Sequence, residues 1–416
     1  MLINILKSYK FQKDDILTIF LMAMAFVIPF GSYYNKKVIF ITFLVWLIMS
    51  GFKTSINIIK KNKFLITFLL LFLFYIMSLL WSDNIKEGQD YILKLFIFMF
   101  VPLLIIATSA NKRNIFIIMT SFIFSMFINE IISYLIYFDI YETAYSRKYH
   151  YPVGFINHIS YSVLVAFSAI LILHQSRYMN NIYIKTIYII FFITMTINLV
   201  ISSGRTGYVA YFATLAILLF TFYKINFKNF LQILLFPTVI FIIGYQLNSS
   251  VQQRVSATIT DVSSIAKDEN YNTSFGTRLA AYPIAWYVLK DNNFLFGVGV
   301  GDLDEEKNSA IYNNNLKNKI RSALHHDHLH NFFADTVVII GLIGLILLLI
   351  SFYFLWKIKI INTEYKFLQQ LIIIIIFTSC FADRILHIQD TMLFFAIFAG
   401  LIVAQNKVEM TLTENK

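Results

Sequence analysis

Charged residues and cysteines are scarce in this chain. Only 14% of its 416 residues are Asp, Glu, Lys or Arg, whereas 58% are hydrophobic. One or two soluble domains of ordinary size could not bury so much apolar surface, so soluble, fibrous and disordered proteins are excluded. The single cysteine, Cys380, lies inside an apolar run. No intramolecular disulfide can form, and the cellular compartment has to be argued from membrane topology.

Internal repeats and nucleotide-binding motifs are also missing. The two halves of the chain differ in loop length and show no repeat, which disfavours a transporter built from related halves. Gly297, Gly299 and Gly301 form a G-x-G-x-G pattern, but no βαβ unit surrounds it. We therefore expect no nucleotide site and no cofactor.

Long apolar runs fill the chain between residues 16 and 404. A helix of about 20 apolar residues crosses a hydrocarbon core of roughly 30 Å, so the sequence predicts an all-α, polytopic membrane helix bundle. The first run lacks a small-residue cleavage pattern and is interpreted as a retained span. The predicted spans number twelve and cover residues 16–34, 38–51, 64–81, 91–108, 115–138, 158–174, 186–202, 207–223, 230–245, 332–356, 367–381 and 391–404.

The basic residues orient these spans. With a cytoplasmic N-terminus, the short inner segments hold eighteen Lys or Arg and the short outer segments hold seven. The positive-inside rule then places both termini in the cytoplasm, and the net charge of +11 needs no nucleic acid to explain it. Residues 1–245 carry spans one to nine, residues 332–416 carry spans ten to twelve and a cytoplasmic tail, and residues 246–331 form one large outer loop.

Short helices are expected in this outer loop. Residues 277–289 are predicted to form an apolar-faced helix that a Ser or Thr cap opens and Pro283 kinks. Arg278 stands in its first turn, where it either binds a diphosphate or makes a weak surface ion pair. Arg205, in the polar hinge between spans seven and eight, either grips the same diphosphate as a planar fork or snorkels to lipid headgroups.

Four of the eight histidines fall within the run of residues 325–331, which ends where span ten begins. Three interpretations stay open: a metal site, a polar stretch at the membrane interface, and a neutral imidazole that takes a proton from an acceptor hydroxyl. A metal site is disfavoured because adjacent residues cannot all converge on one ion. We expect His330 to be fixed by the start of the span and His325 and His326 to be dispensable. His328 is expected to point elsewhere if the helix has already begun there.

Charged residues near the ends of other spans are further candidates. Asp383 and Arg384 follow span eleven at the outer face, where they either pair with each other or take part in a site. Glu130 is expected to face the interior of the bundle, while Lys94 is expected to snorkel. These last two are secondary candidates.

Several short motifs resemble one family, the O-antigen ligase and polymerase superfamily of bacterial inner-membrane glycan transferases. The resemblance rests on His330-Asn331 followed after nine residues by Gly341-Leu342-Ile343-Gly344. It is supported by Ser203-Gly204-Arg205-Thr206, by Gly276-Thr277-Arg278-Leu279 with Tyr282 and Trp286, and by Phe296-Gly297-Val298-Gly299. These motifs cover residues 200–345, and their order and spacing together are fairly specific.

The resemblance implies a substrate and a set of roles. The donor would be a glycan on undecaprenyl diphosphate, and Arg205 and Arg278 would hold the diphosphate with Asp383, Arg384 and His328 nearby. His330 would be the catalytic base or would orient the acceptor. The protein would be a metal-independent glycosyltransferase of the bacterial inner membrane with its active site facing the periplasm, surrounded by membrane lipids.

Three functions remain open at this point. The favoured one is an O-antigen ligase, whose acceptor is a hydroxyl of the lipid A core sugars. An O-antigen polymerase would use the end of another lipid-linked repeat unit. A flippase for the same lipid-linked sugars would instead show pseudo-symmetric halves and interrupted spans that meet at the midplane.

Overall fold

The structure is a computed structural model that describes residues 13–49, 52–149, 151–202, 204–224, 226–247, 249–268, 270–273, 275–314, 316–320, 324 and 328–414. Within these ranges every regular element is a helix, which agrees with the predicted all-α class. The first half contains α2 (Lys13–Phe26), η1 (Ile28–Phe30), α3 (Ser32–Met49), α4 (Phe52–Lys61), α5 (Lys63–Met77), η2 (Ser78–Trp81), α6 (Ile85–Leu95), the π-helical turn η3 (Phe96–Phe100), α7 (Val101–Ser109), α8 (Lys112–Tyr137), α9 (Ala144–Tyr149), α10 (His158–Gln175), η4 (Ser176–Tyr178) and α11 (Ile182–Ile201).

The second half contains α12 (Arg205–Thr221), α13 (Phe227–Leu247), α14 (Ser249–Asp268), α15 (Gly276–Asp291), α16 (Leu303–Asn313), α17 (Lys317–Ile320), α18 (Phe332–Lys357), α19 (Thr363–Ala382), η6 (Ile385–His387) and α20 (Gln389–Glu414).

Eight helices in the described residues are long and apolar enough to cross a membrane. They correspond to eight of the twelve predicted spans, and they are Lys63–Trp81, Ile85–Ser109, Lys112–Tyr137, His158–Tyr178, Ile182–Ile201, Phe332–Lys357, Thr363–Ala382 and Gln389–Leu412. The other four windows fall on α2, α3, α12 and α13. The total of twelve therefore stays a prediction.

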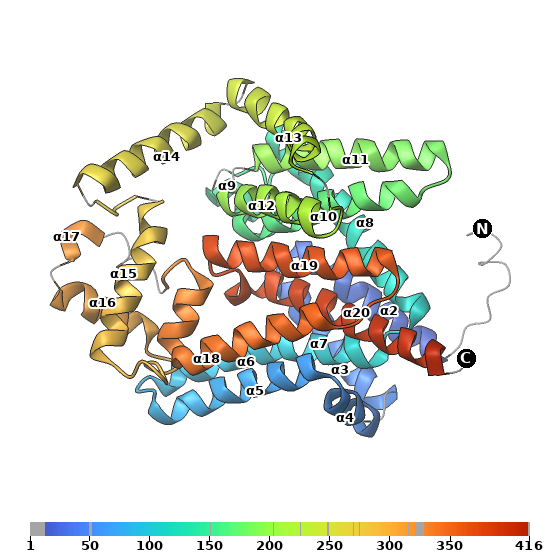
Figure 1. Cartoon of the computed structure of the whole chain (residues 1–416), viewed down its shortest axis with the longest axis horizontal. Helices are drawn as coiled ribbons and strands as arrows, with labels where there is room; N and C mark the ends of the chain where they lie inside the picture. Colours follow the sequence, from blue (N-terminus) through green and yellow to red (C-terminus); the bar gives the residue numbers. More distant parts are fainter. Residues whose placement is uncertain are drawn as a thin grey trace.

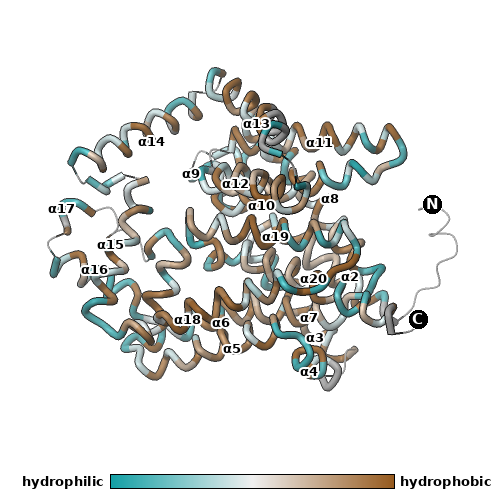
Figure 2. The backbone as a smooth tube through the Cα atoms, viewed as in Figure 1, coloured by the Kyte–Doolittle hydropathy of each residue, from teal (hydrophilic) through white to brown (hydrophobic). Residues whose placement is uncertain are grey.

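Three helices form the centre of the bundle. α10, α19 and α20 have most of their apolar residues buried, and α12 packs against both α10 and α19. α18 packs against α5 and α19, and α20 packs against α7. The long apolar helices lie roughly side by side, with α14 to α17 gathered at one end and the C-terminal turns of α20 at the other (Figure 1). Figure 2 shows hydrophilic residues on α14, on α4 and at the turns where bundle helices end, whereas most of the length of the bundle helices is hydrophobic.

An asparagine begins many of these helices. Its side-chain oxygen accepts hydrogen bonds from the free backbone N–H groups of the first turn, which otherwise lack partners inside the helix. This capping occurs in α5, α6, α8, α10, α11, α18 and α19, through Asn62, Asn84, Asn111, Asn157, Asn181, Asn331 and Asn362. The asparagine of the His330-Asn331 motif therefore has a structural role as the N-cap of α18.

The segment before α15 differs from its prediction. The helix begins at Gly276, its N-cap is Phe275, and no side chain of the N-cap residue contributes a hydrogen bond. Instead, the Phe275 N–H donates to Asp261 of α14 (3.2 Å) and the Gly276 N–H donates to Thr273 Oγ1 (3.0 Å). The helix thus begins one residue before its predicted start, and the side chain of a threonine that precedes it, Thr273, accepts from its first N–H group.

A break interrupts α18 at Ile340 and Gly341, where Gly341 adopts φ 65° and ψ −171°. Backbone groups on both sides of the break form hydrogen bonds with the loop between α15 and α16. The N–H groups of Val298 and Gly299 donate to the carbonyls of residues 338 and 339, at 2.9 and 3.0 Å. In return, the N–H groups of residues 342 and 343 donate to the carbonyls of residues 294 and 295. We call this exchange the α18 clasp.

The clasp explains the glycine pattern that the sequence left without a function. Gly297 and Gly299 have φ of +73° and +110°, which side-chain-bearing residues rarely adopt. A Cβ atom on Gly297 would lie 2.5 Å from the Gly341 nitrogen, and one on Gly341 would lie 2.2 Å from the Leu295 carbonyl oxygen. Backbone meets backbone here, so only glycine fits.

Gly341→Ala should destabilise the protein strongly, because it adds a backbone clash to a conformational strain on the order of 1–3 kcal/mol. Gly31→Ala is the matched control: Gly31 also has a positive φ of +95°, but its added Cβ would meet nothing closer than 3.5 Å. Thermal unfolding in detergent should give a clearly larger loss for Gly341→Ala. Equal losses in the two variants would contradict the clasp.

Candidate active site

The start of α18 meets two other elements through Asn331. Its Oδ1 accepts hydrogen bonds from the N–H groups of Phe333 and Ala334, which caps the helix. Its Nδ2 donates to the Tyr282 hydroxyl of α15 (3.0 Å) and to the Phe381 carbonyl of α19 (3.3 Å). One amide side chain thus holds α15, α18 and α19 together beside His330.

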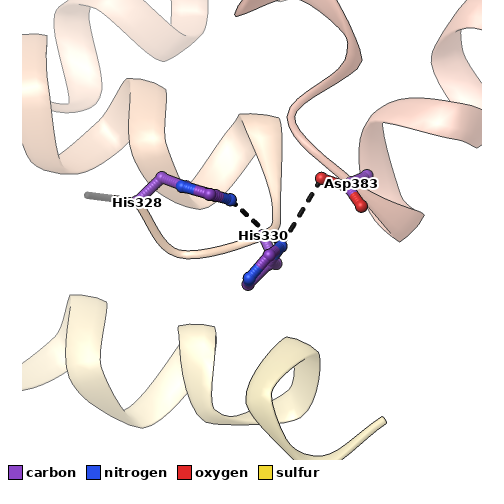
Figure 3. Close-up of side chains that lie close together, drawn as sticks. All are labelled: His328, His330 and Asp383. Carbon is purple, nitrogen blue, oxygen red and sulfur yellow. Dashed lines mark hydrogen bonds and ion pairs between the residues drawn. The ribbon is translucent and has the colours of Figure 1, made fainter. Parts of the chain in front are cut away.

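His330 has a backbone φ of 55°, in the left-handed region that a residue with a side chain seldom occupies. Such strain persists only where surrounding contacts maintain it, and it is common at functional sites. The imidazole Nδ1 lies 3.6 Å from Asp383 Oδ1 and 3.1 Å from His328 Nε2 (Figure 3). The expectation that His328 points elsewhere depended on a helix that had already begun, but α18 begins only at Phe332 and the two imidazoles contact each other.

Asp383 is buried between opposite charges, with its side chain only 2% exposed. Arg278 Nη2 lies 3.1 Å from its Oδ2, the Arg278 Nε donates to the Ala382 carbonyl (2.8 Å), and the Arg384 N–H donates to its Oδ1 (2.8 Å). Burial on its own would raise the pKa of Asp383. The hydrogen bond from His330 and the charge of Arg278 outweigh burial and lower the pKa to about 2. The carboxylate is therefore ionised at physiological pH.

Two alternatives were open for Asp383 and Arg384, mutual pairing or a part in a site. The Asp383 side chain binds Arg278, and Arg384 donates its backbone N–H to Asp383. Arg205 is the first residue of α12, and its Nη1 lies 3.8 Å from Asp261 Oδ2 of α14. The glycines on either side, Gly204 and Gly207, pack against Ser162 of α10. The contacts of Arg205 thus join α12 to α14, and its position opposite Arg278 across a donor site stays a prediction.

Several other expectations can be placed. Glu130 is 2% exposed, which confirms that it faces the interior, and it lies in α8. Lys94 stands in the last turn of α6. Ser203, His325 and His326 lie outside the described residues.

Two buried groups next to the site were not predicted. Asp335, in the first turn of α18, is fully buried and lies 3.6 Å from His387 of η6. A carboxylate inside an apolar run is a signal for function that the sequence did contain. His387 carries no such signal, because only the fold brings η6 against α18.

Among the described residues, one group of histidines and acids has the geometry of a metal site. Ligand atoms of His328, His330 and Asp383 all lie within 4.8 Å of one another. However, one carboxylate oxygen already binds the Arg278 guanidinium, whose positive charge opposes a cation at the same place. The same three residues suit an imidazole that is oriented by an ionised carboxylate.

Residues 190–349 match the family model described as O-antigen ligase. A protein of Haemophilus influenzae that carries the name "Uncharacterized protein" is 24% identical over 379 residues, which cover 86% of this chain and 89% of that relative. The family match confirms the resemblance to the O-antigen ligase superfamily, and with the apolar helices it indicates a multi-pass membrane protein. The matched residues include Arg205, Arg278, His328 and His330, whereas Asp383 lies beyond them.

Asp383 should make the free energy of unfolding depend on pH in the acidic range. The pKa of Asp383 in the folded state, about 2, lies below the ordinary value of 3.8. The ionised carboxylate therefore stabilises the fold fully above pH 3.8, and this stabilisation is lost as the pH falls through 2. The difference between the two pKa values corresponds to roughly 2 kcal/mol in the free energy of unfolding. Unfolding midpoints in detergent at pH 5 and pH 2 should therefore fall more in the wild type than in Asp383→Asn.

The control for this comparison is Glu142→Gln, which removes an acid that is 62% exposed and paired with Arg147. It should leave the pH dependence of the wild type almost unchanged. An Asp383→Asn variant that loses as much stability as the wild type over this range would refute the charge-stabilised carboxylate.

Proposed function

We propose that the protein is an O-antigen ligase, which transfers a glycan from undecaprenyl diphosphate to a hydroxyl of a lipid A core sugar. The observation that carries this proposal is the meeting of His330, Asp383 and Arg278 at one end of a bundle of apolar helices. The family match supports membrane glycosyl transfer of this kind. A lipid-linked donor reaches such a site from the bilayer.

In this proposal Arg278 and Arg205 bind the donor diphosphate. Breaking the bond between the anomeric carbon and the phosphate oxygen leaves the electron pair, and a growing negative charge, on the diphosphate. Fixed guanidinium groups in a partly dry site stabilise that charge, and their planar shape favours two hydrogen bonds to neighbouring oxygens. The bond from Arg278 Nε to the Ala382 carbonyl and its ion pair with Asp383 keep this guanidinium in place.

His330 is the general base in this proposal. Its Nδ1 faces Asp383, so we assign Nε2 to the acceptor hydroxyl. As the hydroxyl oxygen bonds to the anomeric carbon, its proton passes to Nε2. The ionised Asp383 orients the ring and stabilises the imidazolium that forms, as a carboxylate does beside the histidine of other nucleophilic sites.

The proposed site faces the periplasm and both termini lie in the cytoplasm. α14 to α17, which belong to the predicted outer loop, gather at the end of the bundle opposite to the last turns of α20. The same chemistry on the end sugar of another lipid-linked repeat would make the protein an O-antigen polymerase. The acceptor, and not the catalytic groups, separates these two functions.

A deletion strain tests the proposal through its lipopolysaccharide profile on gels. Loss of all polymer on lipid A, with lipid-linked polymer accumulating, is expected of a ligase, whereas a core carrying a single repeat would indicate a polymerase. Complementation with Arg278→Lys or Arg205→Lys should restore little polymer, because lysine keeps the charge but loses the planar fork. Lys290→Arg, on the last turn of α15, is the control and should complement fully. Full activity of both Lys variants at equal expression would exclude bidentate binding.

Transfer by the purified protein tests the base and the absence of a metal. His330→Ala should abolish transfer from lipid-linked glycan to acceptor while the protein still folds, and EDTA should change the wild-type rate little because arginines supply the positive charge. Glu142→Gln, which alters an exposed acid paired with Arg147, is the control and should keep the wild-type rate. Activity that disappears with EDTA and returns with zinc, magnesium or manganese would instead assign His328, His330 and Asp383 to a metal ion.

A further inference from the structure

A chain of buried polar groups lies beside the proposed active site. Asp335 is 0% exposed, and its Oδ1 accepts a hydrogen bond from the N–H of Leu329 at 2.9 Å. Leu329 directly precedes His330, so this bond fixes the backbone that holds the imidazole. The other oxygen, Oδ2, lies 3.6 Å from Nδ1 of His387.

His387 continues the chain on the opposite side of the site. His387 is 7% exposed, and its backbone N–H donates to the Arg384 carbonyl (2.9 Å). Its ring Nε2 is hydrogen-bonded to the hydroxyl of Tyr91 on α6. These contacts fix the short turn that begins at Asp383. Asp335 therefore contacts both of the segments whose side chains meet in the site.

The burial of these groups gives them few alternative arrangements. A buried carboxylate or imidazole that leaves its partner loses a hydrogen bond without gaining water, which costs on the order of 1–3 kcal/mol. Asp335 also stands in the first turn of α18, where the helix dipole favours a negative charge. A single geometry between the two segments is thus favoured.

We propose that Asp335 and His387 are positioning residues that set the spacing between His330 and Asp383. This inference rests on the proposed function, since it gives that spacing a catalytic purpose. Neither residue touches the reacting atoms. They act through His330, whose left-handed backbone has to be held against its own preference.

Asp335→Asn tests the proposal with minimal change of shape. The Asn oxygen still accepts the Leu329 N–H, but its NH₂ group now faces His387 Nδ1 as a donor where an acceptor stood. The negative charge that faces His387 at 3.6 Å is then lost, so the contact between Asp335 and the turn weakens. Because misplacement by about 1 Å can cost a hundredfold in rate, turnover should fall about 10- to 100-fold while the KM for the lipid-linked donor stays within about twofold.

A second readout does not depend on activity. Carbethoxylation by diethyl pyrocarbonate, followed by peptide mass spectrometry, measures how accessible each imidazole is. In Asp335→Asn, His330 should react several-fold faster, while His158, which is hydrogen-bonded to Tyr145 of α9, should keep its rate. The reactivity measurement separates the two proposals. A wild-type protein that transfers no glycan would refute the proposed function, but the reactivity of His330 would still test whether Asp335 positions it.

Two further variants make the test selective. Asp390→Asn is the matched control, because Asp390 is 6% exposed at the start of α20 and binds Asn35 instead of the site. It should change neither turnover nor the reactivity of His330. His387→Gln tests the second residue of the pair in the same way. It replaces Asp335→Asn if that variant does not reach the membrane. Unchanged turnover and His330 reactivity in the positioning variants, or an equal rise in the reactivity of His330 and His158, would overturn the proposal.

Discussion

In the interior of a bilayer every backbone N–H and C=O group needs a partner from the protein itself, and this constraint shapes the end of the bundle that carries the site. α18 is broken at Gly341, yet the four backbone groups exposed by the break all find partners in residues 294–299. The loop that provides them joins α15 to α16. The half of α18 that begins at Asn331 is thereby fixed relative to α15, which carries Arg278.

One buried carboxylate is the centre of the charged groups around the site. The Asp383 carboxylate is buried at the end of α19 and meets the guanidinium of Arg278, the imidazole of His330 and the backbone N–H of Arg384. Arg278 comes from α15 and His330 from the loop before α18, so the carboxylate joins these two segments to the end of α19. Removing the carboxylate leaves a guanidinium and an imidazole close together without an intervening negative charge.

The sequence allowed the all-α class and most of the spans to be predicted, because runs of apolar residues are a local property. It also identified His330, Arg278 and Asp383, which stand at the ends of such runs or in a motif. What it could not predict depends on contacts between distant segments. The orientation of His328, the binding of Arg205 to Asp261 and the partnership of Asp335 with His387 all arise only when helices pack. The role of Asn331 is intermediate, since an N-cap is a local device whose second set of hydrogen bonds reaches α15 and α19.

The α18 clasp has a consequence for biosynthesis. Residues 294–299 precede Gly341 in the chain, so they emerge from the ribosome before the helix that they complete. If residues 246–331 lie outside the membrane, as the sequence predicts, the loop crosses before the two halves of α18 enter. The broken helix would then meet its hydrogen-bonding partners as it inserts, so these backbone groups would not stay unpaired in the bilayer. The loop is therefore synthesised before the broken helix to which it forms hydrogen bonds.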